Sequence, residues 1–280
     1  MAGSLYGSAR IEPGGKPMIL DLFKVTDKVA IVTGAGRGVG AGIATALAEV
    51  GADVVVAARS LDQLEATADA VRATGRRALV VPTDVTERAQ LEHLVAATVA
   101  EFGRIDIVVN NAGGWPPQPL LRTSERAFED AFRFNVTSAF LMTRFAVPHM
   151  VATAGGGVII NISSRAASMV QPGFTSYGTS KAAMSFMTRQ MAPELAPKVR
   201  VNAIELGGVE TDALASVLTD ESIRHQLEDN TPMRRVGQVE DIAAFAVYLA
   251  SPASSWVTGK VFEIDGGVEH PAFTVPYETL

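Results

Sequence analysis

Cysteine is absent from this chain of 280 residues. Without thiols the protein can form no disulfide and no thiolate metal site, so packing and hydrogen bonding alone hold the fold. A sequence free of cysteine suits a reducing compartment, and we expect a cytoplasmic protein whose site contains no metal ion.

Long apolar runs and an excess of positive charge are also missing. No uninterrupted apolar stretch approaches the roughly 18 residues that a membrane-spanning helix needs. Hydrophobic residues nevertheless make up 48% of the sequence, which predicts a soluble globular protein without a membrane span. The 24 basic and 30 acidic residues give a net charge of -6, which disfavours a general binder of nucleic-acid phosphates.

The chain is long enough for one large domain, and its pattern supports a single domain over residues 25–267. Residues 1–24 combine small, polar and Pro-Gly elements, and we expect a flexible extension that ends in a short docking segment. Regular alternation is lost over residues 207–238, which is typical of a substrate loop or lid. The apolar C-terminal tail at 268–280 is expected to pack on another surface, such as a neighbouring subunit.

Short apolar runs alternate with helical patterns along the whole domain. Strands are expected at residues 28–33, 52–58, 78–82, 105–109, 157–162, 199–204 and 260–264, with helices at 61–74, 87–102, 124–150, 175–196 and 239–250. Thr175 or Ser176 should cap the helix that begins there. This alternation predicts an α/β protein, a single-domain Rossmann fold with a doubly wound, parallel seven-stranded sheet and helices on both faces. Ligands of such sheets bind beyond the carboxyl ends of the strands.

A glycine-rich turn, Thr33-Gly-Ala-Gly-Arg-Gly-Val-Gly40, joins the first strand to an alanine-rich helical pattern. Glycines let the backbone approach a diphosphate, and the start of the helix offers free N–H groups and the positive end of its dipole. A merely tight strand-to-helix turn is the alternative. The position between a buried strand and a helix favours the dinucleotide site.

The end of the second strand should contact the adenosine ribose of that dinucleotide. An NAD site usually has a carboxylate there, whereas this chain has Ala58 followed by Arg59 and Ser60, with Arg37 in the glycine turn. Guanidinium groups bind phosphate as a bidentate fork, so the two arginines favour the 2′-phosphate of NADP over NAD. The alternative is that both arginines are solvated and that Asp62 takes the role of the acid.

Polar residues follow other strands as well. Asp84 is suited to accept a hydrogen bond from an adenine amino group or to cap the helix that begins near Thr86. The Asn-Asn-Ala-Gly run at 110–113 leaves space for a ribose and a nicotinamide. Asn135 stands within an apolar helical pattern and needs a polar partner. Trp115 is a candidate wall of a substrate pocket or a packing residue.

The stretch from Asn161 to Lys181 carries the candidate acid and base chemistry. Tyr177 and Lys181 lie four residues apart on one helix face, and an ammonium beside the phenol should lower the pKa of Tyr177. Ser164, at a strand end, would donate to a carbonyl oxygen as negative charge builds on it. A Tyr-x-x-x-Lys pair is also common on solvated helices, so the interpretation depends on the dinucleotide site elsewhere in the chain.

Together these motifs resemble the short-chain dehydrogenase/reductase family, in its single-domain branch. The resemblance covers residues about 28–267 and rests on motifs in the family's order: Thr33-Gly34-x-x-x-Gly38-x-Gly40, Asp84, Asn110-Asn111-Ala112-Gly113, Asn135, Ser164, Tyr177-x-x-x-Lys181, Val201-Asn202-Ala203 and Asp265-Gly266-Gly267. It implies a catalytic tetrad of Asn135, Ser164, Tyr177 and Lys181. Ser164 is preferred to Ser163 because it stands thirteen residues before Tyr177, the usual interval in the family.

The resemblance also implies the roles of these groups. Tyr177 would donate a proton to a carbonyl oxygen as hydride arrives from the nicotinamide. Lys181 would bind the nicotinamide ribose, and Asn135 would hold a water that links Lys181 to solvent. Arg37 and Arg59 are similar to the arginines of NADP-preferring members. The expected cofactor site comprises Gly34, Arg37, Gly38, Val39, Gly40, Arg59, Ser60, Asp84, Val85, Asn111, Ala112, Gly113, Tyr177, Lys181, Gly207, Val209 and Thr211.

Two positions near the expected site need separate comment. The family usually has Pro-Gly after the sixth strand, whereas this chain has Leu206-Gly207, which gives the backbone more freedom there. Val209 and Thr211 still match positions that contact the nicotinamide carboxamide in the family. Arg165 follows Ser164 directly and either meets an acidic substrate or is solvated or salt-bridged, as arginines at strand ends usually are.

These features predict an NADP(H)-dependent oxidoreductase that interconverts a secondary alcohol and a ketone. A bulky apolar substrate, steroid-like or fatty-acyl, is favoured by the candidate pocket residues Trp115, Met169, Phe174, Leu214, Val217, Leu218 and Met233. A 3-oxoacyl-[acyl-carrier-protein] reductase is the nearest alternative, and the acidic net charge counts against it. A catalytically idle nucleotide-binding scaffold is an alternative of another class. Family members usually form tetramers, so a homotetramer or homodimer is expected.

Overall fold

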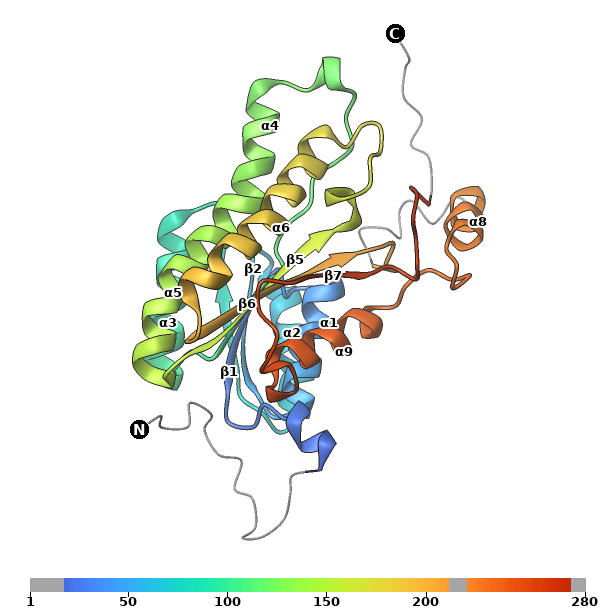
Figure 1. Ribbon diagram of the computed structural model, residues 1–280. Coiled ribbons are helices and arrows are strands. Elements are labelled where there is room, and N and C mark those ends of the chain that lie inside the picture. The colour runs from blue at the N-terminus through green and yellow to red at the C-terminus, as the bar shows by residue number, and fades with distance from the viewer. Residues whose placement is uncertain (1–17, 212–220, 273–280) are drawn as a thin grey trace.

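The computed structural model describes residues 18–211 and 221–272, and Figure 1 shows how their helices and strands are arranged. Residues 1–17 and 273–280 lie outside the described part of the chain. So do Leu214, Val217 and Leu218 of the expected substrate pocket. None of the helices within the described ranges is long and apolar enough to cross a membrane.

Within the described residues, seven parallel strands form one sheet in the order β3-β2-β1-β4-β5-β6-β7. Their bounds are β1 Val29–Thr33, β2 Asp53–Ala58, β3 Ala78–Pro82, β4 Ile107–Asn110, β5 Gly157–Ser164, β6 Val199–Leu206 and β7 Val261–Ile264. The strand order reverses between β1 and β4, and a doubly wound sheet binds its ligands at such a switch point. The predicted seven-stranded Rossmann fold is confirmed.

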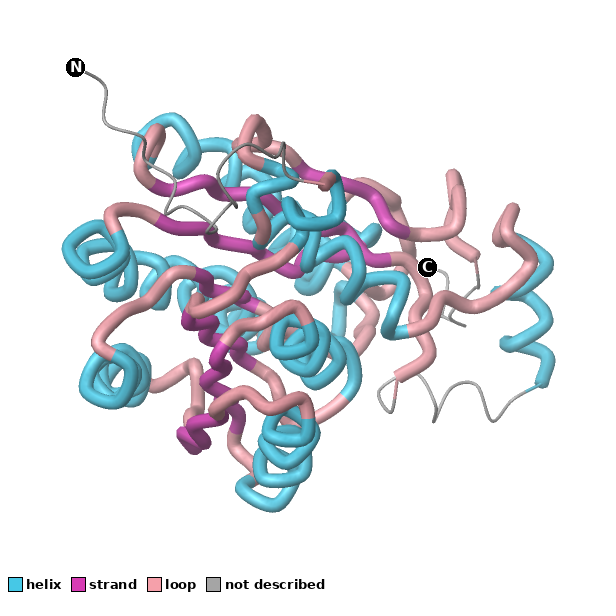
Figure 2. Tube along the Cα trace, turned by 90° about the horizontal axis from the view of Figure 1, so that it is seen from below, coloured by secondary structure: helices cyan, strands magenta, loops and turns pink. Residues whose placement is uncertain are grey.

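Helices lie on both sides of the sheet, as the view in Figure 2 shows. The α-helices are α1 Gly38–Glu49, α2 Leu61–Ala73, α3 Arg88–Phe102, α4 Glu125–Phe132, α5 Ser138–Ala154, α6 Thr175–Leu195, α8 Glu221–Asn230 and α9 Val239–Ala250. Short helical turns are η1 Ile19–Phe23, η2 Leu120–Arg122, η3 Arg133–Thr137, η4 Arg165–Ala167 and η5 Pro252–Ser254. The α1, α2 and α9 helices share one buried core, whereas α3, α5 and α6 share a second core on the opposite face.

Strand β1 shows how the sequence builds these two cores. Every residue of β1 is buried; Ala30 and Val32 pack into one core, while Val29 and Ile31 pack into the other. Successive side chains of a strand point to opposite faces, so a strand that is covered on both sides needs a continuous apolar run. This requirement is why the unbroken run in the sequence predicted a parallel, doubly covered strand correctly.

The helix expected over residues 124–150 is interrupted, which the sequence reading missed. Between α4 and α5 the five residues of η3 form a wider π-helical turn. Asn135 lies within this turn and is fully buried, and single π-turns inside helices often occur at functional sites. The expected cap of α6 is also wrong, because Phe174 takes the cap position without a side-chain cap bond and Thr175 is the first helical residue.

Strands β5 and β6 run two residues beyond their expected ends. Their parallel register continues to the pair Ser164 and Leu206, and β6 also pairs with β7 as far as Leu206 and Ile264. A proline at position 206 would lack the N–H group that a ladder uses. Leucine at this position therefore lets the sheet extend to the strand end that carries Ser164.

Both described ends of the domain contact its body. The ring of Phe23 in η1 lies 6.1 Å from the ring of Tyr248 on α9. Val268, which follows β7, is buried, and Asn230 at the end of α8 donates a 2.9 Å hydrogen bond to the carbonyl oxygen of Ala272. The described start of the tail therefore packs against α8 of its own chain.

Candidate active site

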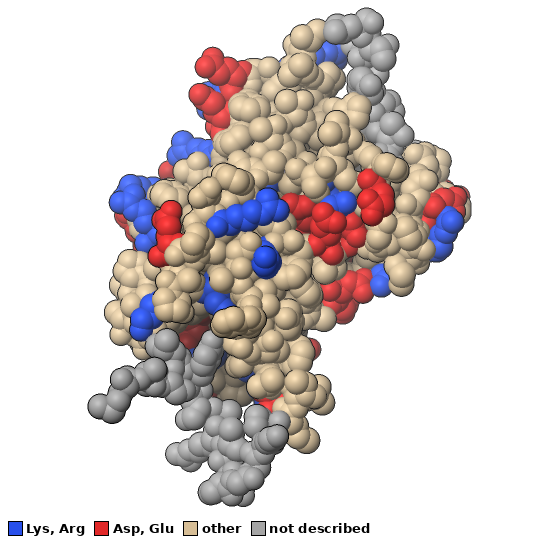
Figure 3. All heavy atoms as spheres, in the orientation of Figure 1, with Lys and Arg blue, Asp and Glu red and all other residues tan. Residues whose placement is uncertain are grey.

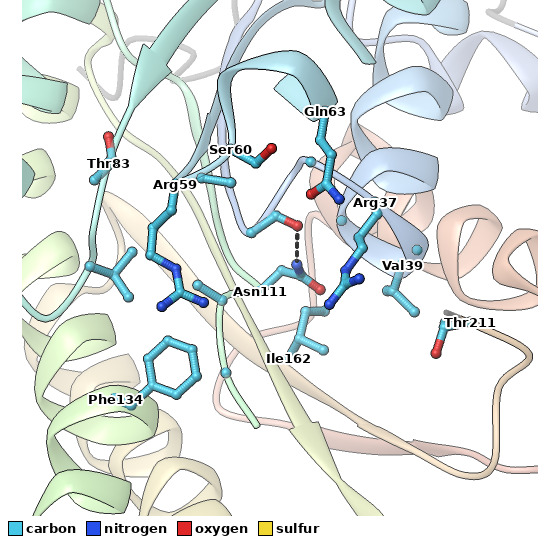
Figure 4. Close-up of a pocket in the computed structure, with 18 of the residues that line it drawn as sticks. Arg37, Val39, Arg59, Ser60, Gln63, Thr83, Asn111, Phe134, Ile162 and Thr211 are labelled. Atoms are coloured by element: carbon cyan, nitrogen blue, oxygen red, sulfur yellow. Dashed lines mark hydrogen bonds between the residues drawn. The ribbon is translucent and has the colours of Figure 1, made fainter. Parts of the chain in front are cut away.

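A cavity of about 370 Å³ opens beyond the carboxyl ends of the central strands (Figure 4). This volume falls within the range typical of sites for small molecules and cofactors. The walls come from the glycine turn after β1, the loops after β2, β3 and β4, and helix α6. The lining residues are Gly34, Gly36, Arg37, Gly38, Val39, Gly40, Ala58, Arg59, Ser60, Gln63, Thr83, Asp84, Val85, Asn111, Ala112, Gly113, Phe134, Ile162, Ser163, Tyr177, Lys181, Leu206 and Thr211.

The glycine turn has the backbone geometry that a diphosphate needs. Gly34 and Gly38 have φ angles of +65° and +55°, a region that residues with a Cβ avoid. A Cβ on Gly40 would lie 2.3 Å from the carbonyl oxygen of Gly34, so only glycine allows this close approach. Helix α1 begins at Gly38 without a side-chain cap and without an acidic residue in its first turn. Its N–H groups are therefore available to an anion, and the turn fits a dinucleotide diphosphate.

Two arginines line the cavity beside the glycine turn and the end of β2. Figure 4 shows Arg37 and Arg59 on opposite sides of Asn111, with both guanidinium groups directed into the cavity. Neither forms an ion pair or hydrogen bond with another described residue of the chain. Asp62, the alternative acid, does not line the cavity. Gln63 does, and the sequence reading missed it although it follows Ser60 by one helical turn.

Asp84 does not cap the helix, as one of the two sequence expectations had it, because α3 begins at Arg88 with Glu87 at its cap position. Its Oδ1 accepts the N–H of Thr86 at 2.9 Å and the Thr86 hydroxyl at 2.7 Å, so it stabilises the turn that leads to α3. Burial raises the pKa of Asp84, but the hydrogen bonds from Thr86 outweigh it, and the pKa is lowered. Asp84 also lines the cavity, where its carboxylate remains a candidate acceptor for an adenine amino group.

Asn111 holds two turns of the site together. Its Nδ2 donates to the carbonyl oxygens of Thr33 at 2.9 Å and Gly34 at 3.2 Å, and its own N–H donates to Thr33 Oγ1 at 3.1 Å. Thr33 Oγ1 also accepts the N–H of Ala112 at 3.1 Å. Thr33, which the sequence reading placed only at the end of a strand, therefore fixes the loop after β4 against the glycine turn.

The side chain of Asn135 is used to shape the loop after β4. Its Oδ1 accepts the N–H of Gly114 at 2.8 Å, and its Nδ2 donates to the carbonyl oxygens of Gly114 at 3.2 Å and Ala131 at 2.9 Å. A Cβ on Gly113 would lie 2.7 Å from this Oδ1 and 2.9 Å from Lys181 Nζ, so both groups converge above Gly113. The expected link from Asn135 through a water to Lys181 stays a prediction.

Tyr177 and Lys181 lie on one face of α6 at the edge of the cavity. Lys181 Nζ is 5.8 Å from the centre of the Tyr177 ring and donates a 2.7 Å hydrogen bond to the carbonyl oxygen of Ile162. Burial lowers the pKa of Lys181 to about 7. Burial also raises the pKa of Tyr177, and a hydrogen bond with Ser164 opposes this rise.

The direction of the Tyr177 pKa differs from the sequence expectation. A nearby ammonium was expected to lower it, but the nitrogen of Lys181 lies over the ring, 5.8 Å from its centre, and forms no hydrogen bond with the hydroxyl among the described contacts. Its hydrogen bond goes to Ile162 instead. Within the chain itself, desolvation of the phenol is the main cause of the raised pKa, and Ser164 rather than Lys181 opposes it. The hydroxyl is thus kept protonated, which suits a proton donor.

The choice between Ser164 and Ser163 follows from their partners. Ser163 is buried, donates to the carbonyl oxygen of Lys181 at 3.1 Å, and lies 3.0 Å from the hydroxyl of Ser185. The Ser164 hydroxyl instead accepts the N–H of Ala166 at 3.2 Å and opposes the rise in the pKa of Tyr177. The hydroxyl of Ser164 therefore stands beside the candidate acid, whereas Ser163 joins β5 to α6.

Of the predicted cofactor contacts after β6, one lines the cavity and two do not. Thr211 lines the cavity, and a Cβ on Gly38 would lie 3.3 Å from its Cγ2. Gly207 and Val209 are not among the lining residues; Val209 is buried and bridges to Gly237. Leu206 takes a place in the wall that the sequence reading did not assign to it. No cluster of metal-ligating side chains occurs among the described residues.

Comparison with known proteins decides the family. The family model described as Enoyl-(Acyl carrier protein) reductase matches residues 34–269. The chain is also 41% identical over 248 residues to 7alpha-hydroxysteroid dehydrogenase of Escherichia coli, an alignment that covers 88% of this chain and 96% of that protein. The chain belongs to the short-chain dehydrogenase/reductase family.

Two further similarities support the assignment to this family. An oxidoreductase of Mycobacterium tuberculosis is 49% identical over 263 residues, which cover 94% of this chain and 100% of the relative. The solved structure of a 7 alpha-hydroxysteroid dehydrogenase complexed with NADH and 7-oxo glycochenodeoxycholic acid matches with a TM-score of 0.86 at 40% identity. That match covers 90% of this chain and 98% of the solved chain. The protein is therefore an oxidoreductase that acts on CH–OH donors with a nicotinamide dinucleotide.

Proposed function

We propose that this short-chain dehydrogenase/reductase is an NADP(H)-dependent enzyme that interconverts a bulky, apolar secondary alcohol and the corresponding ketone. One observation carries the proposal: Tyr177 and Lys181 line the same cavity as the glycine turn that fits a diphosphate, and the Ser164 hydroxyl lies close enough to Tyr177 to oppose the rise in its pKa. A proton donor, a second hydroxyl and a cation thus stand where the reduced ring of a dinucleotide would end.

The chain's own residues supply the acid and base steps. When bound, the dinucleotide supplies or accepts the hydride. In reduction Tyr177 donates its phenolic proton to the carbonyl oxygen while the Ser164 hydroxyl donates a hydrogen bond to the same oxygen. Lys181, in its ammonium form, stabilises the phenolate that remains. Oxidation runs the same proton transfers in reverse, with Tyr177 as the base.

The choice of NADP depends on the two arginines at the end of β2 and in the glycine turn. Arg37 and Arg59 face the cavity with no acidic hydrogen-bond partner, and the strand end lacks the carboxylate that binds ribose hydroxyls in NAD sites. The similar hydroxysteroid dehydrogenase was solved with NADH. The fold therefore does not decide between the cofactors, and the two arginines are the features that support NADP here.

Replacing Arg59 tests the cofactor assignment. Arg59→Ala should weaken NADPH binding by roughly 10- to 100-fold, because a charge-assisted hydrogen bond contributes about 1.5–3 kcal/mol. NADH affinity should change by less than about twofold, since NADH has no 2′-phosphate. Isothermal titration with both nucleotides measures the effect, and Arg72→Ala on the exposed face of α2 is the control. An equal loss for both nucleotides would defeat the NADP assignment.

The surroundings of Tyr177 favour an apolar substrate. The ring of Phe174 lies 6.1 Å from the ring of Tyr177 in an edge-to-face arrangement. Met233 is 63% exposed near the loops after β6 and β7, and Val170 is 91% exposed on the loop before α6. Both side chains are candidates for contact with an apolar substrate. Trp115 is half-buried on the loop after β4.

A panel of carbonyl compounds tests the substrate class. NADPH consumption should proceed with a 7-oxo steroid at a kcat/KM at least about tenfold above that with a small polar keto acid, because each extra 100 Å² of buried apolar surface contributes roughly 2.5 kcal/mol. A 3-oxoacyl thioester provides the comparison with the fatty-acyl alternative. Preference for the polar keto acid would contradict the apolar assignment.

The two alternative functions predict different properties of the protein. An acyl-carrier-protein reductase needs a basic docking surface, and the face shown in Figure 3 has its acidic side chains gathered right of centre and its basic ones spread in small groups. An idle scaffold would bind NADPH yet turn over none of the carbonyl compounds. The intact set of Ser164, Tyr177 and Lys181 favours the enzyme. We also expect a cytoplasmic homotetramer or homodimer, as proposed from the sequence.

A further inference from the structure

Arg165 is buried although it stands directly after Ser164 at the rim of the site. Only 7% of the residue is exposed, and charged side chains are rarely buried to this extent without partners. Arg165 begins η4, and its carbonyl oxygen accepts the N–H groups of Ser168 at 3.1 Å and Met169 at 2.7 Å. The turn after Ser164 therefore starts at a residue whose side chain is buried in the protein interior.

Three carboxylates surround the guanidinium of Arg165. Asp265 Oδ2 lies 2.8 Å from Nε without the alignment of a hydrogen bond, Glu205 Oε2 lies 3.8 Å from Nη1, and Glu263 forms a further ion pair with Nη1. The directed hydrogen bond of Nη1 goes to the Ser168 hydroxyl. Nη2 donates to the carbonyl oxygen of Val268 at 3.1 Å. One side chain thus joins the end of β5 to β6, β7 and the segment after β7. The acidic-substrate alternative loses its support, because these partners already occupy the guanidinium.

Glu205 extends this cluster to helix α6. Its Oε2 accepts a 2.8 Å hydrogen bond from the hydroxyl of Ser168. The same hydroxyl accepts a hydrogen bond from Arg165 Nη1. Its Oε1 accepts the hydroxyl of Ser185 on α6 at 2.7 Å. Ser185 lies one turn after Lys181, so hydrogen bonds connect the turn after β5 with the helix that carries the proton donor.

Stability alone explains this cluster poorly. A buried ion pair often stabilises a fold no more than well-packed apolar residues of the same volume, because desolvation offsets the attraction. Three carboxylates around one guanidinium add repulsion between like charges. A planar guanidinium does, however, fix its partners in direction as well as in distance. Such a cluster is suited to holding the backbone in one geometry.

We propose that Arg165 is a positioning residue for Ser164: its guanidinium, anchored by Glu205, Glu263 and Asp265, fixes the turn that keeps the Ser164 hydroxyl aligned with Tyr177. The inference rests on the proposed function, since it assigns Ser164 the role given there. Arg165 touches neither substrate nor cofactor and acts only through its neighbour. Misplacement of a reacting group by about 1 Å can cost roughly 10²-fold in rate.

A double-mutant cycle tests this role, with Arg165→Lys, Ser164→Ala and the combination measured against the wild type. Lysine keeps the positive charge but loses the fork, so Arg165→Lys should lower kcat by roughly 10- to 100-fold and leave NADPH affinity within about twofold. In the Ser164→Ala background the same substitution should change kcat by less than about twofold, because residues that act through one group are not additive.

The pH dependence of the rate of alcohol oxidation distinguishes a positioning role of Arg165 from a purely structural one, which would leave this dependence unchanged. Ser164 opposes the increase in the pKa of Tyr177. If Ser164 is misplaced in Arg165→Lys, the pKa of Tyr177 should increase further. The rate of alcohol oxidation, which needs the phenolate as base, should then increase only at higher pH, as in Ser164→Ala. Lys181 is the other charged group beside Tyr177, and its bond to Ile162 is untouched by either change. The same direction of shift in both variants supports the proposal.

Arg200 offers a matched control at the opposite end of β6. It donates to the carbonyl oxygens of Val257 at 3.1 Å and Leu249 at 2.8 Å, far from Tyr177. Arg200→Lys should leave kcat and the pH profile unchanged even where it lowers the melting temperature. If Arg165→Lys fails to fold, Glu205→Gln takes its place in the cycle, with a smaller effect expected and the same loss of additivity.

The outcomes separate this inference from the proposed function. A loss from Arg165→Lys of equal size in both backgrounds, or a folded variant with wild-type kcat, would refute the positioning role and leave the enzyme assignment intact. Wild-type kcat in Ser164→Ala would remove Ser164 from the mechanism and refute the positioning role, whereas absence of NADPH-dependent turnover in the wild type with every carbonyl compound would refute the proposed function.

Discussion

Tyr177→Phe should lower kcat by roughly 10²- to 10⁴-fold, the contribution typical of a positioned general acid or base. Phenylalanine fills the same volume on α6 but has no proton to give to the carbonyl oxygen. The ring contact with Phe174 and the glycine turn are unchanged, so NADPH affinity should stay within about twofold. Steady-state rates with the best ketone of the panel and a fluorescence titration with NADPH measure both quantities.

Tyr248→Phe is the control for this substitution. Tyr248 lies on α9, where its ring contacts Phe23 and Phe245, and it takes no part in the site. Its variant should keep the wild-type kcat. Comparable activity in Tyr177→Phe and Tyr248→Phe would remove the tyrosine from the chemistry, whatever the cofactor.

Lys181→Met should lower kcat for reduction at pH 7 by roughly 10²-fold. Methionine keeps the length of the side chain but removes the charge that lies 5.8 Å from the centre of the Tyr177 ring. At separations of roughly 5–6 Å and an effective dielectric constant near 20, an ammonium generally attracts a phenolate by about 3 kcal/mol, or roughly 10²-fold in rate. Stopped-flow measurement of NADPH consumption follows the chemical step. A loss below about threefold would exclude this electrostatic role.

The pH dependence of stability checks that Lys181 is buried as described. Its pKa is about 7 in the folded chain and 10.5 when unperturbed. Between these values the unfolded chain binds one more proton than the folded chain, so the free energy of unfolding rises with pH. The gain is at most about 1.4 kcal/mol per pH unit. Urea denaturation at pH 7.5 and 9.5 should show this rise in the wild type but not in Lys181→Met; parallel curves would contradict it.

Motif and position together made much of the site predictable. Tyr177 and Lys181 had to share a helix face because of their spacing, and the glycine turn had to stand between a buried strand and a helix. The parallel alternation then brought the ends of β1, β4 and β5 to one edge of the sheet, as the structure confirms. Local pattern and topology were sufficient for these features.

Features that depend on distant partners were not predictable. Arg165 and Val268 are 103 positions apart, and no local pattern announces that they meet. The π-helical turn at Asn135 depends on hydrogen bonds to the loop after β4. The pKa of Tyr177 moved against expectation because the bond from Lys181 to Ile162 and the burial of the phenol are both tertiary effects.

The structure of the protein with bound NADPH and an unreactive ketone analogue tests the central claim most directly. The proposal places the carbonyl oxygen within about 3 Å of both Tyr177 Oη and Ser164 Oγ, and its carbon roughly 3–3.5 Å from the reacting carbon of the nicotinamide. The 2′-phosphate should lie against Arg37 or Arg59. A nicotinamide that leaves no room for a carbonyl group beside Tyr177 would contradict the account.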